Sequence, residues 1–305
     1  MARYLATRAI YSVLVIFGVA VLVFFLVRLG GDPTALFLPP ESSIEEIARF
    51  RRQMGFDRPL LIQFGEFVWR ALQGDFGKSL RYGEPAMRLV WDRFPATLQL
   101  SAVSLLLSVV IAVPLGIAAA VNRDSLTDRV GLFFSLVGQS FPTFWLGIML
   151  ILVFSEKLAI LPPSGRGTWQ QLVLPAVSLA AYSTAIITRL LRSSMLEVMQ
   201  ADYIRTARGK GLSERVVVYR HAVRNAAIPT ITVIALQVGA LLGGAVITEE
   251  IFAYPGMGRL AIQAIANRDF TIVQAFVIFM AVLIVAINLA VDACYVLLDP
   301  RLRKS

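Results

Sequence analysis

Long apolar runs separated by short polar connections dominate the pattern of this chain. Uncharged stretches long enough to cross a bilayer, which takes about 20 helical residues, occupy 9–27, 94–122, 130–155, 167–188, 225–248 and 270–291. Backbone groups in hydrocarbon must bond within their own segment, so such runs are helices. The pattern predicts an all-α polytopic membrane protein with six transmembrane helices.

The polar connections divide the chain into four parts. We expect a cytoplasmic N-terminus with the first helix (1–28), an external helical segment (29–93), a transmembrane domain (94–297) that includes a cytoplasmic loop at 193–226, and a cytoplasmic tail (298–305).

The external segment between the first two spans is predicted to hold two helices. Ser42-Ser43 followed by Glu45 and Glu46 is a helix start, with an N-cap and acids in the first turn. This helix is expected to reach about Met54. A second is expected from Pro59 to Leu72, with three aromatic side chains available for packing, Phe64, Phe67 and Trp69.

Positive charge predicts the orientation of the spans. Arg3 and Arg8 precede the first run, the 202–224 loop is rich in Arg and Lys, and Arg301, Arg303 and Lys304 close the chain. All three groups fall on one side if there are six spans. Since cytoplasmic connections carry the excess of Lys and Arg, both termini are predicted to be cytoplasmic.

Composition narrows the function classes. Hydrophobic residues make up 57% of the chain and charged residues 16%, which favours the lipid bilayer as surroundings. The net charge of +9 lies mostly beside apolar runs, so no nucleic-acid partner is expected. One cysteine, Cys294, and one histidine, His221, exclude an internal disulfide and a Cys- or His-rich metal cage.

One motif imitates a nucleotide site. Gly77-Lys78-Ser79 copies the end of a phosphate-binding loop, but Leu72 stands where that loop needs its first glycine. No strand is predicted before it. The chain is therefore not expected to be an enzyme, and any energy that it uses must come from a partner or an ion gradient.

Ionisable residues are nearly absent inside the apolar runs. Arg189 and Asp292 stand at run ends, where each side chain is expected to reach the interface. The alternative hypothesis for the function is a self-sufficient secondary carrier or channel. Such a protein would need intramembrane charges or an inverted repeat. In the fifth run, Gly239, Gly243 and Gly244 either allow close helix packing or line a pathway.

The polar segment from Asp202 to Pro229 carries the first resemblance to a known family. Arg205-Thr206-Ala207, then Gly211, then Ile228-Pro229 resemble the cytoplasmic loop of permease subunits of binding-protein-dependent ABC importers, in the form of the dipeptide and oligopeptide branch. Further resemblance comes from Gly31-Asp32-Pro33, Gly74-Asp75-Phe76-Gly77, Arg93-Phe94-Pro95-Ala96-Thr97, Thr248 to Gly258 and Asp299-Pro300-Arg301-Leu302-Arg303.

The resemblance implies a type I ABC importer permease fold in a bacterial or archaeal inner membrane. The partners would be a homologous second permease, two cytoplasmic ATPase subunits that bind ATP and Mg, and an external substrate-binding protein. Peptides are the expected substrates, although the same branch takes glutathione, nickel chelates and other small solutes.

The resemblance also implies two contact regions. The ATPase-coupling loop comprises Asp202, Arg205, Thr206, Ala207, Arg208, Gly211, Glu214, Arg215, His221, Arg224 and Asn225, with Ala207 and Gly211 as close-approach positions. Its basic residues, Arg220 among them, contact the ATPase or anchor the loop to anionic headgroups. An exposed external loop either meets the binding protein or only caps the sixth span, through Glu249, Phe252, Pro255, Gly256 and Gly258.

Overall fold

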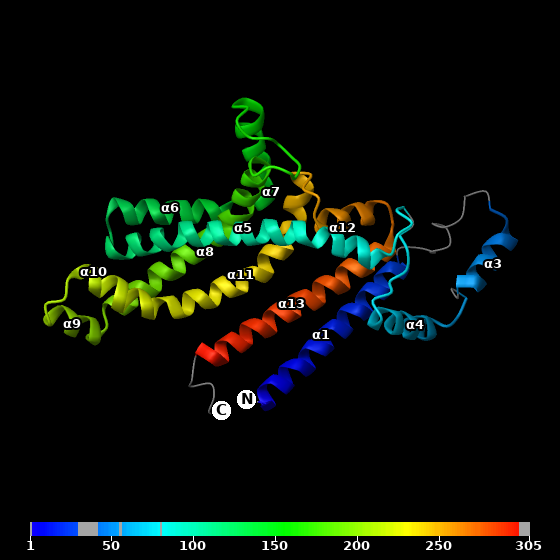
Figure 1. The fold of residues 1–305 in the computed structure, drawn as a ribbon, viewed down its shortest axis with the longest axis horizontal. Helices are drawn as coiled ribbons and strands as arrows, with labels where there is room; N and C mark the ends of the chain where they lie inside the picture. Colours follow the sequence, from blue (N-terminus) through cyan, green and yellow to red (C-terminus); the bar gives the residue numbers. More distant parts are fainter. Residues whose placement is uncertain (1, 30–41, 55–56, 80, 299–305) are drawn as a thin grey trace. The chain divides into compact units, whose positions relative to one another are not determined.

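The computed structural model describes the backbone of residues 2–29, 42–54, 57–79 and 81–298, and the side chains of 7–27, 42–52, 57–79 and 81–292. The motifs at 31–33 and 299–303 and the side chain of Cys294 lie outside these ranges. The described chain is helical apart from turns and a single bridge between Lys78 and Pro85 (Figure 1). The all-α prediction is confirmed.

Two compact units make up the chain. One joins Met1–Pro95 to Gly256–Ser305, and the other is Ala96–Pro255. The last two helices therefore group with the N-terminal part of the chain, a division that differs from the four segments read along the sequence.

The first unit contains α1 (Ala2–Leu29), α3 (Ile44–Met54), α4 (Leu60–Leu72), the first turns of α5 (Ala86–Val121), α12 (Met257–Ala266) and α13 (Phe270–Leu298). The second contains the rest of α5, then α6 (Leu126–Ser140), α7 (Thr143–Leu150), the π-helical turn η1 (Ile151–Lys157), α8 (Gln170–Met199), α9 (Asp202–Gly209), α10 (Glu214–Val216), the π-helical turn η2 (Val217–Ala222) and α11 (Val223–Ile251).

Five described helices are long and apolar enough to span a membrane, and a bent pair raises the number to six if it counts as one span. That pair, α6 and α7 with η1, meets at an angle of 102°. The apolar run at 130–155 is therefore bent rather than one straight helix. Proline disfavours helical geometry in the residue before it, and Phe141 before Pro142 is extended, with φ −93° and ψ 131°.

Helix α5 begins at Ala86, before the apolar run that starts at 94. Its first turns are charged, and Arg88 lies 4.0 Å from Glu84 and 3.8 Å from Asp92, one helical turn away on each side. Pairs at this spacing support a helix modestly. Hydropathy does not register these turns because it detects only the apolar part of the helix.

In the first unit, α1 and α13 lie side by side and run in opposite directions (Figure 1). Arg8 near the start of α1 and Asp292 near the end of α13 form an ion pair, with Nε 3.0 Å from Oδ2. The interpretation of Asp292 as a residue that merely reaches the interface is wrong, since its side chain is 15% exposed and paired.

The loop before α5 is fixed to the start of α13 in the same unit. The Ser79 hydroxyl donates to the carboxylate of Asp269, which is 1% exposed. Asp269 also accepts from the Thr271 hydroxyl and the Ile272 amide. The serine of the apparent phosphate-binding motif thus completes a buried helix cap.

In the second unit, α8 is the central helix, packed against α6, α7 and α11. A Cβ added at Gly244 would stand 3.1 Å from the Leu179 side chain, so this glycine permits close packing of α11 on α8. No other atom of the described chain lies within 4 Å of such a Cβ at Gly239 or Gly243. Of the three glycines, the fold requires only Gly244 for packing.

Candidate functional site

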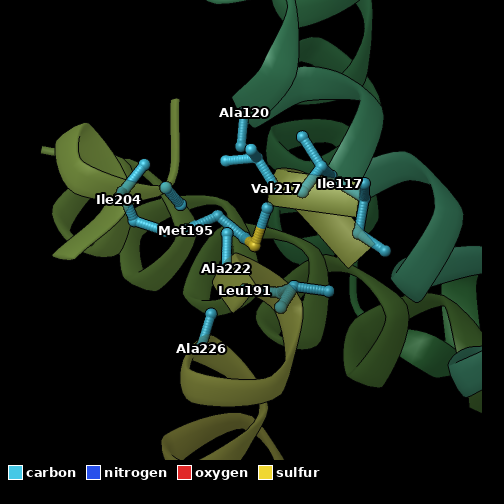
Figure 2. Close-up of a cluster of buried hydrophobic side chains, with 10 residues drawn as sticks. Ile117, Ala120, Leu191, Met195, Ile204, Val217, Ala222 and Ala226 are labelled. Atoms are coloured by element: carbon cyan, nitrogen blue, oxygen red, sulfur yellow. The ribbon is translucent and has the colours of Figure 1, made fainter. Parts of the chain in front are cut away.

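The segment between α8 and α11 is built on a buried apolar cluster (Figure 2). Helices α5, α8, α9 and α11 and the turn η2 all contribute to it. Its members are Ile117, Ala120, Leu191, Met195, Ile204, Ala207, Val217, Val218, Ala222 and Ala226. We call this set the anchor cluster; it attaches α9 and η2 directly to the two long helices α5 and α8.

Amphipathic spacing explains why α9 packs in this way. Ile204 and Ala207 are three residues apart, so they lie on one face of the helix, and they are 0% and 6% exposed. Asp202, Arg205, Thr206 and Arg208 fall on the other faces and are exposed. The apolar side of α9 is thus committed to the anchor cluster, and its polar side is open.

The turn from α9 to α10 has a left-handed residue at Gly211, with φ +75°. A side chain is disfavoured in this conformation, which explains the glycine. No other described atom comes within 4 Å of a Cβ placed there. Within this chain, Gly211 therefore serves the turn rather than a close backbone approach.

A bidentate ion pair spans the same turn. Arg208 donates from Nε and Nη2 to the two carboxylate oxygens of Glu214, at 3.1 and 2.6 Å. This carboxylate raises the pKa of the Arg208 guanidinium above its usual value. The pair fixes α9 relative to α10.

The outward surface of the second half of the segment mixes basic and apolar groups. Arg215, Val216, Tyr219 and Arg220 line a hollow of about 370 Å³, and Tyr219 is 60% exposed. Arg224 and Asn225 are also exposed, and the Asn225 amide donates to the His221 carbonyl at 2.7 Å. We call Arg215, Val216, Tyr219 and Arg220 the outer patch.

Of the predicted coupling residues, Ala207 is the one the structure buries most, and His221 is half-buried. Ala207 was predicted to be a close-approach position, and within this chain its methyl group is enclosed by the anchor cluster. The other predicted residues of this loop are exposed on a single segment.

Sequence reasoning missed an ion pair between α6 and α8. Arg192 donates from Nε and Nη2 to both carboxylate oxygens of Asp128, at 2.6 and 2.7 Å. The Asp128 side chain is 3% exposed and also accepts from the Asp124 amide at 3.0 Å. The one available signal was an acid in a short turn together with an arginine near the end of an apolar run.

The predicted external loop is largely buried. Glu249 is 0% and Phe252 1% exposed, Gly256 and Gly258 are also buried, and Pro255 is half-buried. Glu249 accepts a hydrogen bond from the Thr97 hydroxyl. The prediction of an exposed loop is wrong, because these side chains belong to the interior of the fold.

Among the described residues, no group of three or more His, Cys, Asp or Glu side chains is placed to hold a metal ion. The 202–225 segment offers guanidinium donors and exposed aromatic surface at Tyr219.

Two family descriptions together cover most of the chain. "Binding-protein-dependent transport system inner membrane component" matches residues 112–304, and the description of the N-terminal part of such membrane components matches residues 1–101.

Curated relatives match over nearly the full length. The glutathione transport system permease protein GsiC of Salmonella choleraesuis (strain SC-B67) is 41% identical over 304 residues, with 99% of both chains covered. The protein of the same name from Escherichia coli (strain K12) is 40% identical over 304 residues, again with 99% of both chains covered.

Solved structures support the fold at low identity. The inward-facing MetNI methionine ABC transporter aligns with a TM-score of 0.55 and 19% identity, over 68% of this chain and 95% of that chain. An amino acid ABC transporter with histidines aligns with a TM-score of 0.54 and 15% identity, over 70% and 94%.

The helical spans and these fold neighbours define a multi-pass permease with the type I ABC importer fold. The chain belongs to the family of binding-protein-dependent transport system inner membrane components, in the oligopeptide and dipeptide branch. It is a permease component of a binding-protein-dependent ABC importer.

Proposed function

We propose that this permease forms half of an ATP-driven import pathway for glutathione or a related short peptide, and that the 202–225 segment docks on an ATPase subunit. The substrate class rests on the full-length similarity to permeases named for glutathione transport. The docking role rests on one observation: a basic, partly apolar surface is held rigidly on the anchor cluster.

The outer patch has the composition of a protein contact. Exposed Tyr219 and Val216 offer apolar area, and Arg215 and Arg220 stand beside them. Arginine and tyrosine are favoured in protein interfaces. A groove on an ATPase subunit with an apolar floor and an acidic rim would complement this patch in shape and charge.

The anchor cluster gives a physical route for movement. ATP and Mg are bound by the partner ATPases, and closure of those subunits would displace the docked segment. Ile204 on α9 packs in one cluster with Ile117 on α5 and Met195 on α8. Because packed side chains leave little free volume, a shift of α9 would be passed to both long helices, and the Asp128–Arg192 pair would carry it to α6.

The Arg8–Asp292 pair supports the proposed topology. It joins the start of α1 to the end of α13, so these two helices cross the membrane in opposite directions. We propose an even number of crossings, with the bent pair α6–α7 as one of six. The excess of positive charge supports a cytoplasmic location for both termini and for the 202–225 segment.

Charge reversal in the outer patch tests the docking role. The R215E/R220E variant of this permease would be assembled with the second permease, two ATPases and the binding protein, and the complex would be purified in nanodiscs. These positions are preferable to Arg208, whose reversal would also break its pair with Glu214. The matched control is R123E, at an exposed arginine in the turn between α5 and α6.

We expect R215E/R220E to release the ATPases and to lower binding-protein-stimulated ATP hydrolysis at least tenfold, while R123E retains both. A bulky residue at Gly211, as in G211W, should have the same effect through the turn. Wild-type ATPase stoichiometry with normal transport in R215E/R220E would refute the docking role.

Uptake by proteoliposomes tests the substrate separately. With the cognate binding protein outside, glutathione is expected to stimulate ATP hydrolysis and to be taken up. Stimulation by dipeptides but not by glutathione would reject the glutathione assignment and leave the permease role intact.

A further inference from the structure

Helix α4 has three distinct faces. Successive residues of an α-helix are about 100° apart, which places Phe64, Phe67 and Ala71 on one face. Gln63, Glu66 and Arg70 form a narrow polar strip. The remaining arc of about 120° holds only apolar residues and glycine: Leu61, Ile62, Gly65, Val68, Trp69 and Leu72.

The first face packs on α1 through aromatic rings. The Phe64 ring centroid lies 5.3 Å from that of Phe24 and 5.9 Å from that of Phe17, and Phe67 lies 5.5 Å from Phe24. The apolar span of α1 runs from Thr7 to Val27, so Phe17 stands at its middle. Phe64 therefore reaches the depth of the hydrocarbon core rather than the water outside it.

The third face is largely exposed among the described residues. Leu61 is 80%, Leu72 77% and Trp69 66% exposed. Of the three aromatic residues predicted to be available for packing, Phe64 and Phe67 contact other rings, and Trp69 is mostly exposed. An apolar face of this size in water would be unfavourable, whereas a face at this depth beside a membrane span meets lipid.

We propose that α4 is a membrane-embedded interfacial helix, lying in the leaflet that contains the C-terminal half of α1. Its Leu61–Trp69–Leu72 face contacts acyl chains, continuing the exposed apolar surface of α1 at Leu22 and Leu26. Its polar strip, including Arg70 and the Arg58–Glu66 ion pair, faces the headgroups. Short helices with one apolar face and a charged strip bind membrane interfaces in this manner.

Lipid accounts for this face better than a docked protein does. The charged groups occupy the strip next to the apolar arc and none lies within it, whereas a soluble binding protein would have to leave that arc in water whenever it dissociates. Trp69 at the edge of the arc suits the boundary between acyl chains and headgroups. The inference does not depend on the substrate or on the docking of the ATPases.

Lipid-borne quenchers test the proposal in the full complex. Single cysteines would be introduced at Leu61, Trp69 or Leu72 in a C294S background, labelled with a fluorophore and reconstituted in vesicles containing nitroxide-labelled phosphatidylcholine. The matched controls are E66C on the polar strip of the same helix and R51C on α3, whose side chain is exposed. All variants must retain the wild-type melting temperature.

We expect lipid nitroxide to quench L61C and L72C at least twofold more than E66C, and water-soluble iodide to show the opposite order. Addition of excess binding protein should change neither. Quenching of L61C and L72C by iodide, or protection that appears only with binding protein, would overturn the proposal.

A tryptophan readout keeps the test decisive if a cysteine variant fails to insert. Trp91, Trp145 and Trp169 would be changed to phenylalanine, leaving Trp69 as the only tryptophan. Brominated lipid should then quench most of its emission. Emission that brominated lipid leaves unchanged would reject the lipid contact.

Discussion

Arg192 of α8 holds Asp128 of α6 through two hydrogen bonds of 2.6 and 2.7 Å, in a site where the carboxylate is 3% exposed. The pair joins the start of α6 to α8 a few residues from the anchor cluster. Removal of either charge leaves the other buried without a partner, which lowers the stability of the fold strongly.

The first prediction is that D128A lowers the free energy of unfolding by about 3 kcal/mol. Thermal unfolding of the purified permease in detergent measures this. The control is D124N, which removes an exposed charge but keeps a residue type that tolerates the left-handed backbone at this position, φ +63°, and should change stability by less than about 0.5 kcal/mol. Equal effects of the two variants would mean that the pair contributes nothing beyond surface charge.

The second prediction separates the two residues of the apparent phosphate-binding motif. S79A removes a donor from the buried Asp269 carboxylate and should lower the free energy of unfolding by about 1–3 kcal/mol. K78A should be nearly neutral, because the Lys78 side chain is exposed and its carbonyl, which accepts from Thr271, is retained. Thermal unfolding of both variants is measured with and without ATP. If ATP stabilises the wild-type protein and K78A loses that stabilisation, the structural role of this motif is contradicted.

The third prediction concerns the turn between α9 and α10. G211A forces a side chain into a left-handed conformation, φ +75°, and should cost about 1–2 kcal/mol. G211N should cost less, since asparagine tolerates this region. Gly209 ends α9 and has open space around it, so G209A is expected to be neutral or slightly stabilising. The same destabilisation in G209A and G211A would show that the turn geometry is not the cause.

The fourth prediction tests the anchor cluster. I204A removes a side chain that is 0% exposed and should lower the free energy of unfolding by about 2–5 kcal/mol. Because α9 would then pack loosely on α5 and α8, ATPase stimulation should fall even where the ATPases remain bound. The neighbouring Y203A alters a side chain that is 46% exposed and should leave stability nearly unchanged. Full stimulation in I204A would show that transmission does not pass through this cluster.

Much of the membrane architecture could be read from the sequence because hydrophobic periodicity is a local property. The first run, 9–27, matches the span at Thr7–Val27, and the last, 270–291, matches Phe270–Asp292. The two helices of the external segment begin and end close to the predicted positions.

Pairings between distant segments could not be read in this way. Asp128 and Arg192 are 64 residues apart, and Ser79 and Asp269 are 190 apart. A charged residue near the end of an apolar run has the same local pattern whether it reaches the interface or meets a partner on another helix, as Asp292 does with Arg8.

The sequence by itself determined that this protein is a helical membrane protein with an amphipathic basic segment, because span length, charge bias and helical spacing are all set by neighbouring residues. Only the tertiary structure decided that Ala207 and Glu249 are buried, that the third span breaks sharply at Pro142, and that Asp128 meets Arg192. These features depend on which helices pack together, and that choice minimises the free energy of the whole chain rather than of any one stretch.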